Sequence, residues 1–387
     1  MKPIPMLDLK LEYEYMKKDI DDAIARCLEH QRWILGPEVK ALEDKIAGYL
    51  GVSNCVGISS GTDALVLGLR ALALQRIEKE YWARNDKIIT TPFTFTATGD
   101  AILRSGATPV FVDIDPGTFN IDPEKIEACL SSHQGVVGII PVHLYGQSCA
   151  MDRIMDLARQ YNLFVLEDVA QAMGGMYNGR KLGSIGDMGA FSFFPSKNLG
   201  GFGDGGMVST NDQELADLVR MLTKNGGKDK YNVAHIGYNA RLDTLQAAVL
   251  LAKLKYFTTL LADRKRIARL YSQGLRNEKL VKLPVDDFPD QQSDNSHVYH
   301  QYTVRILNGR RPNLQKFLKE NTIDSAIYYP VPLHKMPLFQ NRCQMAGKLS
   351  HAEDACQEVL SLPIGFQLSG QNIHFVCEQI KEWVHLS

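Results

Sequence analysis

Residues 163–168 read Leu-Phe-Val-Leu-Glu-Asp, an unbroken apolar run that ends in two carboxylates. Such a run is typical of a strand buried on both faces of a largely parallel sheet. Further candidate strands lie at 55–58, 87–90, 108–112, 136–141, 189–193 and 207–209. Helical patterns lie between several of them, at 63–74, 97–105, 123–130 and 151–161. This alternation predicts a three-layer α/β domain with its chemistry at the carboxyl ends of the strands.

The C-terminal third of the chain has a different pattern. The elements expected there are a long helix at 244–274, a loop at the Asp-rich stretch 285–296, a strand at 300–306, and helices at 313–321 and 371–384. They predict a smaller α+β domain. We therefore divide the chain into a large domain at 1–255 and a small C-terminal domain at 256–387.

Charge and composition exclude several classes of protein. The 387 residues include 43 Lys+Arg and 44 Asp+Glu, a formal net charge of −1, and 45% are hydrophobic. Nucleic acids and anionic membranes bind clustered positive charge, so neither is expected as a partner. The densest basic cluster, Arg264-Lys265-Arg266, lies in a helical pattern and predicts a solvated helix face. No run approaches the roughly 20 apolar residues that span a bilayer.

The seven cysteines are widely spaced and form no CxxC pair, which argues against both a zinc site and a disulfide framework. Reduced thiols are typical of the cytoplasm. The N-terminus lacks the long apolar stretch of a secretory signal. We therefore expect a soluble, cytoplasmic protein without a bound metal.

Two candidate binding features follow the first predicted strands. Ser60-Gly61-Thr62-Asp63 lies where a strand gives way to a helix, and free backbone N–H groups at that point suit a phosphate. An ordinary helix cap is the alternative interpretation. Phe95 follows the next strand, where an aromatic ring can stack on a planar ligand. Aromatic residues in such positions more often belong to the core.

Two candidate catalytic residues follow later strands. Asp168 ends the run at 163–168, where a carboxylate is well placed to contact a ligand, although a helix cap or surface ion pair gives the same pattern. Lys197 follows a strand and precedes a run of glycines, which is typical of a side chain directed into a cleft. Most lysines, by contrast, are simply solvated.

Other motifs are rejected on their context. Residues 201–206 contain the GxGxxG pattern of dinucleotide-binding proteins but lead into a strand, whereas that fingerprint leaves a strand and opens a helix. Gly227-Lys228 is followed by Asp229, so it is not a P-loop. His297 and His300 lead into a strand-like segment, in which side chains three residues apart point to opposite faces. This argues against a metal site.

The retained features match the requirements of pyridoxal 5′-phosphate (PLP). A lysine amine forms a Schiff base with the cofactor, and a carboxylate keeps its pyridine nitrogen protonated. A phosphate-binding turn and a ring-stacking aromatic complete such a site. The sequence therefore predicts a PLP enzyme with Lys197 and Asp168 as its catalytic residues.

Longer motifs resemble one family. The chain resembles the DegT/DnrJ/EryC1/StrS sugar aminotransferases, of PLP fold type I, whose fold is a three-layer α/β/α domain with a mostly parallel mixed sheet. The matching stretches are ILGPE (34–38), SGTDAL (60–65), TFTAT (94–98), PVHLYGQ (141–147), LEDVAQAMG (166–174), FSFFPSKNLG (191–200), GDGG (203–206), GYNARLDTLQAA (237–248) and YYPVPLH (328–334).

The resemblance implies a role for each matching residue. Lys197 would form the Schiff base, and Asp168 would contact the pyridine nitrogen. The other implied cofactor contacts are Gln171 beside the ring hydroxyl, Phe95 stacked on the ring, and Gly61, Thr62 and Ser192 at the phosphate. Asn239 would reach the phosphate of the neighbouring subunit, which implies a homodimer with shared active sites. His334 would lie near the sugar substrate.

The resemblance also implies a reaction. An amino donor, L-glutamate by family habit, would convert PLP to pyridoxamine 5′-phosphate, which would then aminate a keto sugar carried on a nucleoside diphosphate. The segment PSKNLG…GDGG is similar to family members that act at C3, so a 3-keto hexose is expected. A PLP-dependent sugar dehydratase is one alternative, although related dehydratases replace the lysine with histidine. A non-catalytic regulator with the same fold is the other.

Overall fold

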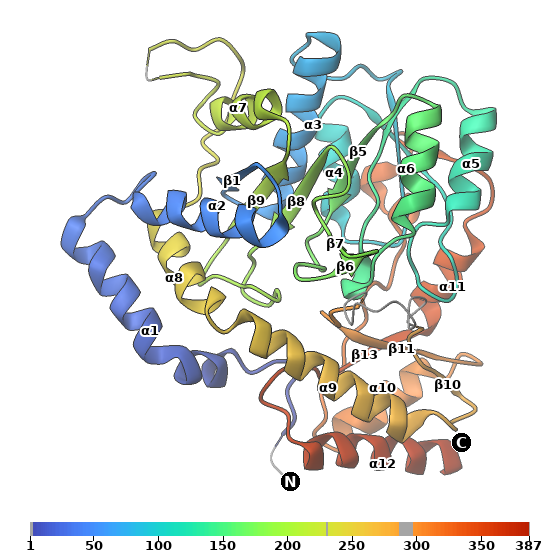
Figure 1. Cartoon of the computed structure of the whole chain (residues 1–387). Helices are drawn as coiled ribbons and strands as arrows, with labels where there is room; N and C mark the ends of the chain where they lie inside the picture. The colour runs from blue at the N-terminus through green and yellow to red at the C-terminus, as the bar shows by residue number, and fades with distance from the viewer. Residues whose placement is uncertain (1–2, 230, 286–296, 387) are drawn as a thin grey trace.

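The computed structural model describes residues 3–229, 231–285 and 297–386. A mixed sheet of eight strands forms its centre (Figure 1). In spatial order the strands are β1 (Asn54–Ile58), β9 (Gly206–Thr210), β8 (Met188–Ser192), β5 (Phe164–Asp168), β4 (Val136–Ile139), β2 (Lys87–Thr90), β3 (Thr108–Phe111) and β12 (Gln344–Met345). Strand β9 is antiparallel to both neighbours, and all other pairs are parallel. The predicted mostly parallel mixed sheet is confirmed.

Helices cover both faces of this sheet, as predicted for three layers (Figure 1). One face packs against α3 (Gly61–Ile77), α4 (Thr96–Arg104) and α7 (Gln213–Leu222). The other packs against α2 (Pro37–Leu50), α5 (Pro123–Ser132), α6 (Met151–Gln160) and α8 (Thr244–Leu254). In β5, Phe164 and Leu166 pack in the core on the α3 side of the sheet, and Val165 packs in the core on the α2 side. Because both faces are buried, every position of the strand is apolar until its end.

A smaller unit surrounds a three-stranded antiparallel sheet of β10 (Val281–Lys282), β11 (Tyr302–Ile306) and β13 (Val359–Leu362). Its helices are α9 (Phe257–Leu275), α10 (Arg311–Glu320), α11 (Ser350–Glu358) and α12 (Gly370–Leu386). Tyr271, Tyr302 and Ile380 belong to its core, and Ile4 from the start of the chain joins them. The boundary at residue 255 stays a prediction. Two contacts cross this boundary: Ile4 packs in the core of the smaller unit, and β12 pairs with β3 of the large sheet.

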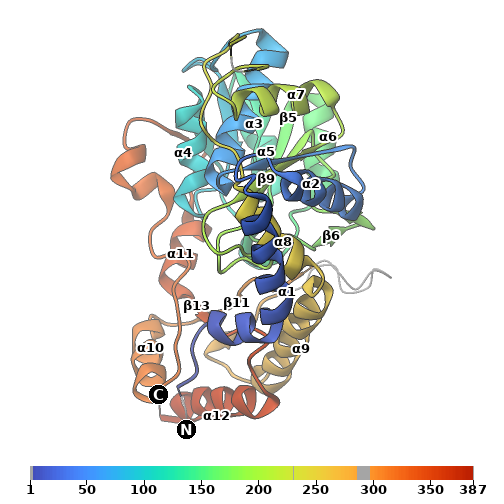
Figure 2. The ribbon, with the colours of Figure 1, turned by 90° about the vertical axis from the view of Figure 1, so that its left-hand side faces the viewer.

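The prediction of one helix at 244–274 is wrong. Helices α8 and α9 are separate and bent by 62°. Asp19, on α1 (Leu9–His30), binds the junction: its carboxylate lies 2.5 Å from Lys255 Nζ and accepts a hydrogen bond from the Tyr256 hydroxyl. Helix α1 packs along α8 (Figure 2). The bend therefore lies at a tertiary contact, within a segment whose local pattern is continuously helical.

The remaining elements are short. They are the hairpin of β6 (Met176–Tyr177) and β7 (Arg180–Lys181) and three 3₁₀ turns, η1 (Leu144–Gly146), η2 (Leu333–Lys335) and η3 (Pro337–Phe339). The predicted loop at 285–296 lies, apart from Val285, outside the described residues. Within the described ranges, no single helix meets the length and apolarity of a membrane span, and only the bent pair α8–α9 meets them jointly.

Candidate active site

A cavity of about 470 Å³ opens at the carboxyl ends of β5 and β8, where the chemistry was expected. We call it the Lys197 cavity. Seven of the nine predicted site residues line it: Gly61, Thr62, Phe95, Asp168, Gln171, Ser192 and Lys197. They come from segments spread over more than a hundred residues of the chain. The sheet topology therefore brings together the side chains that the motifs had selected.

Lys197 lies on the turn after β8, and its backbone N–H donates to the Phe194 carbonyl at 2.8 Å. Gly200 closes this turn, since a Cβ there would lie 2.2 Å from the Pro195 carbonyl oxygen. Burial lowers the pKa of the Lys197 ammonium to about 8, although the negative charge of Asp168 opposes the shift. A lysine with this pKa presents a substantial fraction of neutral, nucleophilic amine near neutral pH.

Asp168 ends β5 with its carboxylate in the cavity and is 5% exposed. The Thr98 hydroxyl donates to Oδ2 at 2.8 Å, and the Ala170 N–H donates to Oδ1 at 3.1 Å. Burial raises the pKa of this carboxyl above its ordinary value, and the hydrogen bond from Thr98 partly offsets the rise. A carboxylate buried in this way is stabilised by a cationic ligand group, such as a protonated ring nitrogen.

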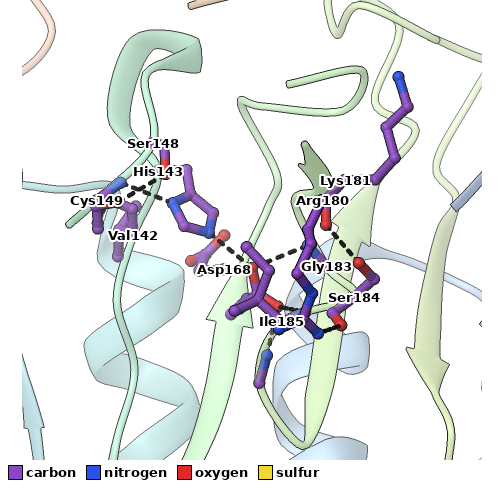
Figure 3. Close-up of polar contacts among 12 residues, drawn as sticks. Val142, His143, Ser148, Cys149, Asp168, Arg180, Lys181, Gly183, Ser184 and Ile185 are labelled. Carbon is purple, nitrogen blue, oxygen red and sulfur yellow. Dashed lines mark hydrogen bonds and ion pairs between the residues drawn. The ribbon is translucent and has the colours of Figure 1, made fainter. Parts of the chain in front are cut away.

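The neighbouring Glu167 points to the opposite face of β5 and anchors the strand end. Its carboxylate accepts a hydrogen bond from His143 Nε2 at 3.1 Å. It also accepts from the backbone N–H groups of Gly183, Ile185 and Gly186 at 2.7–2.9 Å. Figure 3 shows this network around His143 and the 183–185 turn.

Burial would raise the pKa of Glu167, but His143 and the backbone N–H donors outweigh burial and lower it. The residue is therefore a charged anchor. His143 is fixed in turn, because its Nδ1 accepts from the Cys149 N–H at 3.1 Å. The anchor holds the end of β5, and with it Asp168, in one position.

The turn before α3 is both a helix cap and an open amino end. Ser60 Oγ accepts from the Asp63 N–H at 3.1 Å, so the cap interpretation is correct for Ser60. Gly61 and Thr62 begin the helix and line the cavity, and the first N–H groups of a helix have no partner within it. A Cβ at Gly61 would lie 2.6 Å from Ser192 Cβ. Glycine thus permits close packing of the helix end against β8, around a space suited to an anion.

Aromatic and amide groups form another wall. Phe95 precedes α4, is 55% exposed, and lies 6.1 Å from the Tyr329 ring, centroid to centroid. Gln171 accepts the Tyr145 N–H through Oε1 at 2.8 Å and donates from Nε2 to the Tyr329 hydroxyl at 3.0 Å. The amide is held in one orientation, and the exposed Phe95 ring has a face available for stacking.

Two predicted site residues lie outside the cavity lining. Asn239 is exposed on the segment before α8, and its Oδ1 accepts a hydrogen bond from Arg241. His334, in η2, donates from Nε2 to the Glu353 carboxylate at 3.0 Å. From the same YYPVPLH motif, Tyr328 and Tyr329 line the cavity. Within one chain, therefore, the tyrosines of this motif lie closer to the chemistry than its histidine.

The sequence reasoning missed several residues of the cavity. Thr98 and Tyr328 lie in the TFTAT and YYPVPLH motifs, but no role was predicted for either residue. His300 and Gln301 also line the cavity, and no local pattern distinguished them from strand residues. His297 lines a separate cavity beside Lys181, so the two histidines diverge as predicted.

The expected solvated face at Arg264-Lys265-Arg266 is wrong for its first member. Arg264 is 6% exposed, and its Nη1 donates to the carbonyls of Tyr299 at 3.3 Å and His300 at 3.0 Å. Burial lowers its pKa to about 10. The guanidinium supports the turn that carries His300 rather than facing water.

One group of potential metal ligands occurs among the described residues: Cys27, His30 and Glu38 place ligand atoms within 4.8 Å of one another. His30 Nδ1 accepts the Arg32 N–H at 3.0 Å, so the ring proton is on Nε2, which lies 3.1 Å from Glu38. In this tautomer Nε2 has no lone pair for a metal. The contact is a His–Glu hydrogen bond.

Comparisons with known proteins agree with this geometry. The DegT/DnrJ/EryC1/StrS aminotransferase family model matches residues 14–381. The chain is 42% identical to a pleiotropic regulatory protein of Geobacillus stearothermophilus, over 98% of each chain. It is 38% identical to the UDP-2-acetamido-2-deoxy-3-oxo-D-glucuronate aminotransferase of Pseudomonas aeruginosa, over 97% of this chain and 98% of the relative.

Among solved structures, S. venezuelae DesV in complex with a ketimine intermediate has a TM-score of 0.91 and 38% identity, over 99% of each chain. The chain therefore belongs to the DegT/DnrJ/EryC1/StrS aminotransferase family. The cofactor of this family is PLP, as the motifs predicted. The Lys197 cavity fits it: the chain offers an amine, a buried carboxylate, and a helix end whose glycine leaves space for a phosphate.

Proposed function

We propose that this protein is a PLP-dependent aminotransferase that transfers an amino group from L-glutamate to a nucleotide-linked 3-keto hexose. One observation carries the proposal: Lys197, Asp168 and the amino end of α3 open into the same cavity. An amine, a buried carboxylate and an anion-binding helix end suit the aldehyde, ring nitrogen and phosphate of one cofactor.

The chain's residues then divide the work. PLP, when bound, supplies an electron-poor ring that stabilises the charge left on the substrate carbon after proton removal. Lys197 Nζ would bind the cofactor and, when free, would move the proton as base and then acid. A pKa of about 8 suits both directions near neutral pH. The Asp168 carboxylate, oriented by Thr98, holds a proton on the ring nitrogen.

The acceptor is proposed from the relatives and the lysine segment. The P. aeruginosa relative is described as acting on a 3-oxo sugar attached to UDP. The PSKNLG…GDGG segment, similar to C3-directed members, favours the same position. L-glutamate is proposed as donor on family resemblance.

A homodimer with shared active sites is supported by apolar surface at the cavity. Phe95 and Phe194 line it while 55% and 52% exposed, and Phe202 nearby in sequence is 47% exposed. Apolar surface concentrated in this way is typical of an interface. Asn239 is also exposed, as expected for a residue that reaches a second subunit. We propose a cytoplasmic location, since all seven cysteines are free and six are buried.

A regulatory role is the second candidate, because the G. stearothermophilus relative is described as a pleiotropic regulatory protein. A regulator without catalysis has no need of a buried lysine whose pKa is lowered to about 8. It also gains nothing from a buried carboxylate at the cavity wall. A dehydratase is less well supported, because position 197 is lysine.

The visible absorption spectrum tests the proposal. The purified protein should show the band of lysine-bound PLP, lose it on addition of L-glutamate, and recover it with a nucleotide-linked 3-keto hexose. Recovery with the 4-keto isomer alone would contradict the position. A protein without the band after addition of PLP would contradict the enzyme and favour the regulator.

A further inference from the structure

Two polar atoms near Lys197 have no hydrogen-bond partner. His300 is 7% exposed, and its Nδ1 is fully buried without a partner. Gln301, the next residue, has a buried and unpartnered Oε1. Both residues line the Lys197 cavity. Buried polar groups are nearly always paired, so such atoms in a binding cavity point to a ligand that supplies the partner.

The backbone that carries these side chains is fixed in place. Arg264 Nη1 donates to the carbonyls of Tyr299 and His300, and the Val298 N–H donates to the Gly146 carbonyl at 2.9 Å. Gly146 allows the two segments to approach, because a Cβ at this position would lie 2.9 Å from the backbone nitrogen of His300. The backbone at the cavity wall is therefore fixed, so only side-chain rotation is needed to bring the two buried polar atoms to a ligand.

The hydrogen-bonding capacity of the pair selects between the two substrates. An amide oxygen only accepts, so Gln301 Oε1 requires a ligand O–H or N–H. The imidazole is neutral, because burial and the positive charges of Lys197 and Arg264 hold the pKa of His300 far below its ordinary value. A neutral imidazole both donates and accepts.

The carboxylates of L-glutamate offer only acceptors, whereas a hexose offers groups that donate and accept. We infer that His300 and Gln301 form a subsite for the hydroxyl or amide N–H groups that flank the keto carbon of the sugar. The inference rests on the proposed function and assigns one wall of the cavity to the sugar acceptor.

Half-reactions separate this role from a structural one. Holoenzyme variants His300→Phe and Gln301→Met keep side-chain bulk and remove the polar atoms. Each is mixed rapidly with L-glutamate, or with UDP- and dTDP-linked 3-amino hexoses that run the sugar half-reaction in reverse, and loss of the visible band is followed. We expect the rate constant for the amino sugar to fall about 10-fold, with less than about twofold change for glutamate. His300→Asn, which restores a polar atom near the Nδ1 position, should recover part of the loss.

His297→Phe is the matched control, because His297 is 4% exposed on the same turn but lines the other cavity. An equal loss in this control, equal losses in both half-reactions, or weaker PLP binding in the Gln301 variant would overturn the subsite. A wild-type protein that reacts with glutamate but with no amino sugar would instead refute the proposed acceptor. Wild-type reaction with unaffected variants would refute the subsite alone.

Discussion

Among the groups of the protein, Lys197 should set how the rate of PLP uptake by the apoenzyme depends on pH. Only the neutral amine attacks the aldehyde of the cofactor. Burial lowers the pKa of Lys197 to about 8, so uptake should rise with pH, bend near pH 8 and then become constant. The quantity to be measured is the pH at which the uptake rate stops rising, which we call the bend of the pH profile.

The size of the effect follows from the shift. The ordinary pKa of lysine is 10.5, and 10.5 − 8 gives about 2.5 pH units. At pH 7 the neutral fraction is then about one tenth, which is about 300-fold more than an unperturbed lysine would have. The negative charge of Asp168 raises the Lys197 pKa. Asp168→Asn should therefore move the bend to lower pH.

The assay is stopped-flow absorbance of apoenzyme mixed with PLP from about pH 6, two units below the expected bend, to about pH 11, above the ordinary pKa of lysine. Asp204→Asn is the control, since Asp204 lines the same cavity but is exposed and does not shift Lys197. A wild-type bend near pH 10.5 would refute the argument from burial. An Asp168→Asn bend at or above the wild-type value would refute the assigned role of that charge.

Three substitutions test the rest of the site. Asp168→Asn should lower kcat on the order of 100-fold or more, because it removes the charge that keeps the ring nitrogen protonated; a kcat near wild type would exclude this role. Gly61→Ala places a Cβ 2.6 Å from Ser192 Cβ, so chemical unfolding should show a loss of about 1–3 kcal/mol and titration a weaker PLP affinity. Gly48→Ala, inside α2, meets nothing within 4 Å and is its control, which should gain up to about 1 kcal/mol and lose none. Thr98→Val leaves Asp168 Oδ2 without its hydroxyl donor; it should cost about 1–3 kcal/mol in unfolding free energy and lower kcat, and Thr98→Ser should restore both.

The central strands could be predicted within a few residues because burial on both faces gives each an apolar run. Strands of two residues, such as β10 and β12, could not, since only their partners define them. Helix α1 has a buried stripe that includes Met16, Ile20 and Ala23, a helical spacing that the prediction did not use. The bend at residues 255–256 is contacted by Asp19, more than 200 residues away in sequence, and a local pattern does not show such a contact.

Some residues of the site could likewise be predicted from the sequence, and others could not. Asp168, the last residue of β5, and Lys197, on the turn after β8, could be selected because parallel strands end at one edge of the sheet. His300 and Gln301 reach that edge through the turn supported by Arg264, which itself resembled a surface residue in sequence. Their position is a property of the assembled fold.

Strand β12 also has a mechanical consequence. It belongs to the C-terminal third of the chain yet pairs with β3, and the Ala346 N–H donates to the Phe111 carbonyl at 2.9 Å. The N–H groups of His351 and Ala352 donate to Asp113 at 2.9 Å. A swing of the smaller unit as one rigid body would break these bonds, so the stretch from β12 to Ala352 moves with the large sheet. The amide of Ala346 should then exchange its hydrogen as slowly as those of the central sheet.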